Sequence, residues 1–107
     1  MNDMPAAREL AIPIPHDRIA EFCRKWGIRK LSFFGSVVRD DFDPERSDVD
    51  VLVEYREPRN VGLFDLIHAE QELATIFGRK VDLADGIRES LWPYVKDDLV
   101  VEYVEES

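Results

Sequence analysis

The chain has 107 residues, which is the length of one small domain. Its 23 acidic residues outnumber its 14 basic residues and leave a net charge of -9, which argues against a DNA- or RNA-binding protein, because affinity for a phosphate backbone comes mainly from Lys and Arg. Cys23 is the only cysteine, and no apolar run has the length of a secretion signal or a membrane span, so we expect a reducing, cytoplasmic location without disulfides or membrane contact.

The N-terminal part of the chain predicts an arm followed by a helix. Residues 1–14 have no regular period and contain closely spaced prolines, so we expect an extended arm before a domain of residues 15–107. Four apolar residues then recur with the spacing i, i+3, i+4 and i+7: Ile19, Phe22, Cys23 and Trp26. This spacing predicts a helix over residues 17–26, and Gly27 follows as its C-terminal stop.

The central part of the chain contains two apolar segments on either side of a polar turn. Residues 31–34 are mostly apolar and aromatic, which predicts a buried strand that ends at Gly35. Residues 36–41 predict a short helical segment, and residues 41–46 are polar and contain a proline, which predicts an exposed turn. Residues 49–55 then contain a run of Val and Leu that is typical of a central strand.

The second half of the chain predicts a long helix, a strand and a short C-terminal helix. The long helix should span residues 62–77, because its apolar residues recur on one face. These residues are Leu63, Leu66, Ile67, Leu73, Ala74 and Phe77. Residues 80–84 predict a third strand. Ser90 is expected to cap the short helix, with Pro93 in its first turn, and residues 100–104 either add a strand or extend that helix.

The expected order of elements is helix, strand, strand, helix, strand and helix. This order predicts an α+β (mixed α/β) fold with a small mixed sheet, because helices and sheets bury their apolar faces against each other in layers. We expect the helices mainly on one face of the sheet, which leaves the opposite face open for a site.

Acidic residues in two of the predicted strands suggest a metal site. Side chains on a strand alternate between its faces, so Asp48 and Asp50 point the same way with their α-carbons about 6.5 to 7 Å apart. Two such carboxylates repel each other unless a cation lies between them, and Mg²⁺ binds a few carboxylates together with phosphates and water. Asp82 is the acidic residue inside the third strand and would supply a third carboxylate to a site for phosphoryl transfer.

The end of the first strand carries residues suited to bind phosphate. Gly35 has no β-carbon to obstruct a phosphate, Ser36 adds a hydroxyl donor, and Arg39 follows one helical turn later. The alternatives are a simple turn at Gly35 and Ser36 and solvated charges at the aspartates. A second pair, Asp41 and Asp43, shows that the spacing of the aspartates alone is a weak signal; the combination of glycine-serine, the aspartate pair and Asp82 in three consecutive predicted strands is a much rarer one.

Taken together, three segments resemble the signature of the polymerase-beta-type nucleotidyltransferases. They are Gly35-Ser36, residues 47–53 and Val81-Asp82-Leu83. The similarity extends from about Ile14 onward and is closest to the minimal, MNT-like proteins, which form the antitoxin halves of HEPN/MNT toxin-antitoxin pairs. It implies a palm of sheet and helices, Mg²⁺ as cofactor, ATP as substrate and transfer of AMP to a hydroxyl. For antitoxin members that hydroxyl is a tyrosine of the HEPN ribonuclease partner, whose modification silences it.

The resemblance also implies roles for individual residues. The catalytic and metal-binding residues would be Asp48, Asp50 and Asp82, with Asp82 helping to deprotonate the acceptor. The nucleotide-binding residues would be Gly35, Ser36, Arg39 and Ser47. The family usually has ten residues between glycine-serine and the aspartate pair, whereas residues 37–47 make eleven, and Asp40 stands where many members have glycine. We expect the additional residue in the turn at residues 43–46, with both strands kept in register.

Two classes of function are compatible with the sequence. The first is an enzyme that adenylylates a protein. A chain of this length offers few residues to enclose a small-molecule acceptor, whereas a protein acceptor would supply its own contact surface. The second is a non-catalytic binding module that neutralises its partner by forming a complex. Retention of Asp48, Asp50 and Asp82 favours the enzyme, because a decayed site would be free to lose them.

Overall fold

The computed structural model describes residues 12–38, 43, 48–56, 61–86 and 89–105. Its elements, in chain order, are α1 (His16–Trp26), β1 (Ile28–Phe34), the 3-10 turn η1 (Gly35–Val38), β2 (Val49–Tyr55), α2 (Leu63–Phe77), β3 (Val81–Ala84), α3 (Trp92–Val95) and β4 (Val100–Val104). The predicted strand at residues 49–55 has these bounds. The first strand begins at Ile28 and not at residue 31, because Gly27 adopts a left-handed conformation with φ 70° that turns the chain from helix directly into strand.

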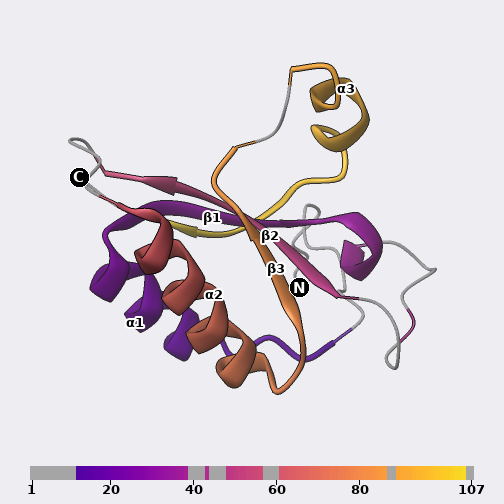
Figure 1. Cartoon of the computed structure of the whole chain (residues 1–107). Coiled ribbons are helices and arrows are strands. Elements are labelled where there is room, and N and C mark those ends of the chain that lie inside the picture. Colours follow the sequence, from indigo (N-terminus) through magenta and orange to yellow (C-terminus); the bar gives the residue numbers. More distant parts are fainter. Residues whose placement is uncertain (1–11, 39–42, 44–47, 57–60, 87–88, 106–107) are drawn as a thin grey trace.

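The four strands form one mixed sheet in the order β3-β2-β1-β4. β1 pairs antiparallel with both β2 and β4, and β2 pairs in parallel with β3. Figure 1 shows α1 and α2 against one face of this sheet, whereas α3 stands on the opposite side. The predicted α+β fold is therefore confirmed, and residues 100–104 form a strand instead of extending a helix. We call the face opposite α1 and α2 the open face.

The hydrophobic core lies between the sheet and the pair α1 and α2. The predicted stripe of α1 is confirmed at Ile19, Phe22 and Cys23, which are buried. Phe33 of β1 meets Phe77 of α2 edge to face, with their ring centroids 5.8 Å apart. The predicted arm falls mostly on residues 1–11, outside the described part of the chain, but Ile12 is buried and belongs to this core. Among the described residues, no helix combines the length and the apolar character needed to cross a membrane.

The predicted apolar stripe of α2 is wrong at its beginning. Leu63 and Ile67 are 69% and 39% exposed, and the first buried position of the helix is Ala69. The helix ends at Phe77 as predicted, followed by a left-handed Gly78. Leu66 packs against the core, so the periodicity identifies one face of the helix correctly, but it cannot show that Leu63 and Ile67 are left uncovered by other elements.

The short helix α3 also differs from its prediction in one detail. Its N-cap residue is Leu91 and no side chain caps it, so the predicted capping role of Ser90 is wrong. Pro93 lies in the first turn as predicted, where its missing N–H costs no helical hydrogen bond. Three large apolar side chains of this region are exposed: Leu91, Trp92 and Tyr94.

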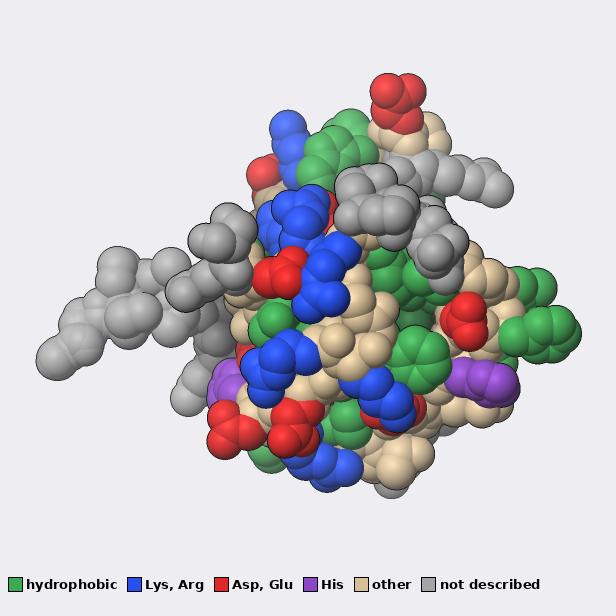
Figure 2. All heavy atoms as spheres, turned by 90° about the vertical axis from the view of Figure 1, so that its left-hand side faces the viewer, with side chains coloured by type: hydrophobic (Ala, Val, Ile, Leu, Met, Phe, Trp, Pro, Cys, Tyr) green, Lys and Arg blue, Asp and Glu red, His purple; other side chains and the backbone are tan. Residues whose placement is uncertain are grey.

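Charged side chains of both signs alternate over the left-hand side of the molecule in Figure 1, which faces the viewer in Figure 2. Several of them form ion pairs between elements. These pairs are Lys25–Glu72 at 2.7 Å, Arg29–Glu54 at 2.5 Å and Arg56–Glu105 at 2.5 Å. Pairs exposed to this degree contribute on the order of 0 to 1 kcal/mol each, so they add little to the stability that the core provides.

Burial of the Cys23 thiol should make the fold less stable at alkaline pH. Burial raises the pKa of Cys23 to about 12 from its ordinary value of 9.0, Glu102 raises it further, and Arg24 opposes the shift. Because the unfolded chain releases this proton at lower pH than the folded chain, the stabilisation is complete below about pH 9 and is lost as the pH rises toward 12. We expect the free energy of unfolding, measured with urea, to be about 1 to 2 kcal/mol lower at about pH 10.5 than below about pH 9. This decrease should be absent from Cys23→Ala.

Candidate active site

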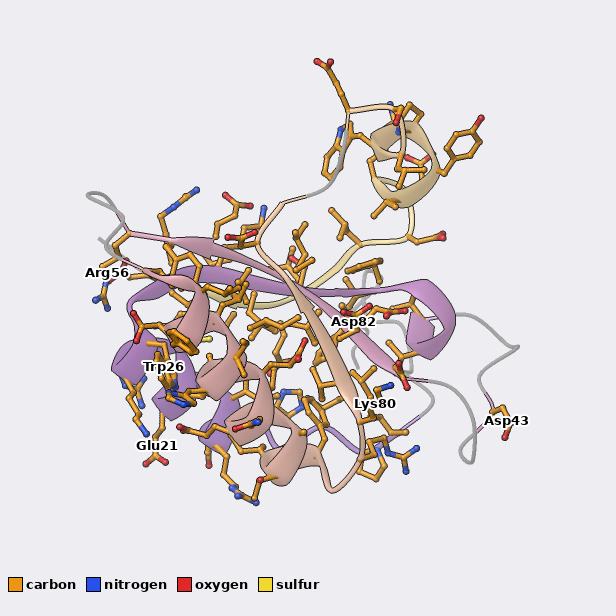
Figure 3. The ribbon with its side chains drawn as sticks, viewed as in Figure 1. Glu21, Trp26, Asp43, Arg56, Lys80 and Asp82 are labelled. Carbon is orange, nitrogen blue, oxygen red and sulfur yellow. The ribbon has the colours of Figure 1, made fainter. Side chains whose placement is uncertain are left out.

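The three aspartates predicted to form the site lie on the open face. Asp50 of β2 is paired in register with Asp82 of β3, and Asp48 precedes Asp50 by two residues. The intervening and following residues of β2 are fully buried toward the helices: Val49, Val51 and Val53. Because strand side chains alternate, Asp50 points to the other face, where Asp82 is exposed (Figure 3). The structure thus brings together the aspartates of two predicted strands.

Gly35 lies against the carboxylate of Asp50. Phe34, the last residue of β1, is paired with Asp50, and the chain then turns at Gly35 with φ 75°. A β-carbon at Gly35 would lie 3.1 Å from Cγ of Asp50 and would overlap its Oδ2. The missing side chain of Gly35 therefore leaves room for a carboxylate of the site, and only glycine adopts this backbone conformation without strain.

The remaining predicted nucleotide-binding residues are described less completely. Ser36 is in η1 directly after Gly35, as a residue that follows the first strand should be, whereas Arg39 and Ser47 lie outside the described residues. The turn predicted to hold the additional residue also lies mostly outside them. The β1–β2 ladder is continuous from Lys30 to Phe34 on one strand, so the longer connection is compatible with the expected register.

The sequence interpretation did not include Lys80, which contributes a cation to the same site. Its Nζ lies 3.8 Å from Oδ2 of Asp48, and its backbone carbonyl accepts a hydrogen bond of 3.0 Å from the N–H of Val49. Lys80 precedes Asp82 by two residues, and Figure 3 shows Lys80 where the chain enters β3 and Asp82 on the strand. Only the parallel pairing of β2 with β3 brings this residue to Asp48.

Glu70 is a second residue that the sequence analysis does not single out. Glu70 of α2 is half-buried, and its Oε2 accepts a hydrogen bond of 2.8 Å from the backbone N–H of Leu83, the residue after Asp82. β3 is an edge strand of four residues that is paired on one side with β2. Glu70 therefore satisfies a donor on the other side of β3 and holds the strand that carries Asp82.

Two replacements of Glu70 should distinguish the effect of its hydrogen bond to Leu83 from the effect of its charge. We expect Glu70→Leu to lower the free energy of unfolding by about 1 to 3 kcal/mol, because it leaves the partly buried N–H of Leu83 without its acceptor. Glu70→Gln keeps an oxygen at the same distance along the side chain and should retain most of the stability. Urea denaturation of the two variants measures the difference, and equal stabilities would contradict this role.

The three aspartates meet the requirements of a magnesium site only when a nucleotide contributes. Among the described residues, no three His, Cys, Asp or Glu side chains converge closely enough to hold an ion by themselves. Mg²⁺ is usually bound by one or two carboxylates together with substrate phosphates and water, so it does not need a complete cage of protein ligands. Asp50 and Asp82 are in register on neighbouring strands and Asp48 directly precedes β2. All three supply carboxylate oxygens, so they fit this kind of site.

Comparisons with known proteins show the family of the chain. The model of the nucleotidyltransferase domain family matches residues 17–105. A Methanocaldococcus jannaschii protein that bears the name protein adenylyltransferase is 34% identical over 88 residues, which cover 82% of this chain and 89% of that protein.

Two solved complexes share the fold. The crystal structure of a toxin-antitoxin with AMP-PNP superposes with a TM-score of 0.69 at 18% identity, over 87% of this chain and 76% of that one. The tri-AMPylated HEPN toxin of Shewanella oneidensis in complex with its MNT antitoxin gives a TM-score of 0.61 at 17% identity, over 84% and 70% of the two chains. With the domain match at residues 17–105 and the three aspartates on one face, the chain belongs to the nucleotidyltransferase family.

Proposed function

We propose that the protein transfers AMP from ATP to a tyrosine hydroxyl of a HEPN-type ribonuclease toxin and thereby acts as its antitoxin. The observation that carries this proposal is the register of β2 and β3, which places Asp50 beside Asp82 on the open face with Asp48 two residues away. The name of the M. jannaschii relative and the composition of the two toxin-antitoxin complexes support the donor, the acceptor protein and the role as antitoxin.

The proposed reaction is an in-line displacement at the α-phosphorus of ATP. A bond forms between the tyrosine oxygen and this phosphorus, and the bond from the phosphorus to the bridging oxygen of the β-phosphate breaks. Pyrophosphate leaves with the electron pair, and the tyrosine proton passes to Asp82 and then to water. Magnesium bound at Asp48, Asp50 and Asp82 would neutralise charge on the attacking and leaving oxygens.

The β1 side of the aspartates is the proposed site for the triphosphate. Gly35 and Ser36 begin a 3-10 turn directly after β1, where successive backbone N–H groups can face an anion. Arg39 and Ser47 are proposed to add further contacts to the nucleotide. Because Gly35 also leaves room for Asp50, the same glycine shapes the phosphate site and one of the metal ligands.

A protein acceptor fits the surface around the open face. Leu91, Trp92 and Tyr94 are exposed on and beside α3, which stands on that side of the sheet (Figure 1). Exposed apolar side chains that gather on one short helix favour contact with another protein over contact with a small molecule. This supports the choice of a protein as the acceptor.

Labelled ATP tests the proposal. The protein is incubated with the proposed HEPN-type partner, magnesium and ATP labelled at the α-phosphate, with a matched reaction that contains a chelator. We expect label on a tyrosine of the partner, located by peptide mapping, and none in the presence of the chelator. A partner that is silenced without acquiring label would contradict the proposal and favour a binding module that acts by complex formation alone.

A further inference from the structure

The open face has two sides that differ in charge. On the β1 side of Asp50 lies Gly35, which belongs to the proposed triphosphate site. On the β3 side lie Asp82, which is paired with Asp50, and Lys80, which directly precedes β3 and places its Nζ 3.8 Å from Oδ2 of Asp48. If the triphosphate is on the β1 side, the acceptor approaches on the β3 side, and Lys80 brings a positive charge to that approach.

The ion pair of Lys80 does not account for its position. Its Nζ is 3.8 Å from Oδ2 of Asp48, and the two side chains are 80% and 35% exposed. An ion pair this long and this exposed to water contributes on the order of 0 to 1 kcal/mol. The ammonium group has three donors, so it can bind an anion at the site with little loss of stability.

We propose that Lys80 holds the phosphate of an AMP group that is already attached to the acceptor, and so promotes the addition of further AMP groups. This inference rests on the proposed function. A tyrosine hydroxyl is neutral and gains little from a cation beside it. After one transfer, however, the acceptor carries a negatively charged phosphodiester, and its next reactive hydroxyl is on the attached ribose. The ammonium of Lys80 is a compact charge suited to bind such a phosphate.

In each further addition the same bonds form and break as in the first transfer. The ribose oxygen forms a bond to the α-phosphorus of a second ATP, and pyrophosphate leaves. The ribose proton passes to Asp82 and then to water. Asp48, Asp50 and Asp82 place several negative charges at the site, and the whole chain carries a net charge of -9, so an anionic acceptor is repelled unless a local cation compensates. Lys80 is a cation that contacts one of these aspartates, at 3.8 Å from Oδ2 of Asp48.

The test compares two acceptors and four forms of the enzyme. The acceptors are the unmodified partner protein and the same protein with one AMP attached, purified after a brief reaction. The enzymes are the wild type, Lys80→Gln, Lys80→Arg and Lys25→Gln. Lys25 is a matched control, because it is an exposed lysine in an ion pair but lies on α1, in the helical layer. The quantity measured is the kcat/KM for the modified acceptor divided by the kcat/KM for the unmodified acceptor.

We expect Lys80→Gln to lower this ratio by about tenfold, because the variant loses a charged hydrogen bond to the attached phosphate. Lys80→Arg should restore most of it, and Lys25→Gln should leave it unchanged. If Lys80 only orients Asp48, both transfers fall equally and the ratio stays constant, which would overturn the inference. A wild-type enzyme that stops after one AMP would also overturn it, whereas absence of any transfer would overturn the proposed function itself.

Discussion

Asp50→Asn is expected to lower the rate of AMP transfer by at least about a hundredfold. Asp50 is in register with Asp82, and its carboxylate lies against Gly35. This carboxylate is therefore central to the proposed metal site. Replacement of a residue that only hydrogen-bonds to a metal ligand lowers metal affinity or activity about 10- to 100-fold. Replacement of a ligand itself should lower the activity further. The measurement is the initial rate of AMP transfer to the partner protein at saturating ATP.

The stability of Asp50→Asn provides the control for this loss. Asparagine keeps the size of the side chain and one of its oxygens, so the melting temperature shows whether the variant is folded at the temperature of the assay. Asp97→Asn is the matched variant, because Asp97 is exposed in the turn between α3 and β4. It should keep wild-type transfer. A fully active Asp50→Asn protein would remove Asp50 from the proposed mechanism.

Gly35→Ala should lower AMP transfer at least about tenfold and destabilise the fold by about 1 to 2 kcal/mol. The left-handed backbone at φ 75° is one cause, because a β-carbon in this conformation costs roughly 1 to 2 kcal/mol. The second cause is specific to the site: the added carbon would overlap Oδ2 of Asp50 and displace its carboxylate. A displacement of this kind is enough to disturb metal and phosphate geometry.

Gly78→Ala separates these two causes. Gly78 also has a positive φ, of 70°, but an added β-carbon there meets nothing within 4 Å. It should therefore lose a similar amount of stability, measured by urea denaturation, while AMP transfer stays close to the wild-type rate. If Gly35→Ala and Gly78→Ala lose activity to the same extent, the contact between Gly35 and Asp50 has no part in catalysis.

Local patterns in the sequence predict the parts of the fold that depend on neighbouring residues. The strand Val49–Tyr55 and the end of α2 at Phe77 have their predicted bounds, because a run of Val and Leu and a helix-ending glycine are local signals. The exposure of Leu63 and Ile67 was not predictable in this way, since it depends on which side chains of the helix other elements cover.

The site residues also divide into those with a local signal in the sequence and those without one. Asp48, Asp50 and Asp82 were identified from their places in predicted strands, and the structure brings them to one face. Lys80 and Glu70 were missed because their roles depend on the parallel pairing of β3 with β2 and on the packing of α2 beside β3. A lysine before a strand or a glutamate within a helix has no local signal that distinguishes it from a solvated charge.

The mass of the partner protein recovered from cells tests the central claim most directly. The HEPN-type partner is co-expressed with the wild-type protein or with the Asp48→Asn, Asp50→Asn double variant, and its intact mass is measured after purification. We predict that the wild type raises the mass of the partner by one or more AMP groups and that the double variant leaves it unmodified and toxic. An unmodified partner that both proteins silence equally well would contradict the account.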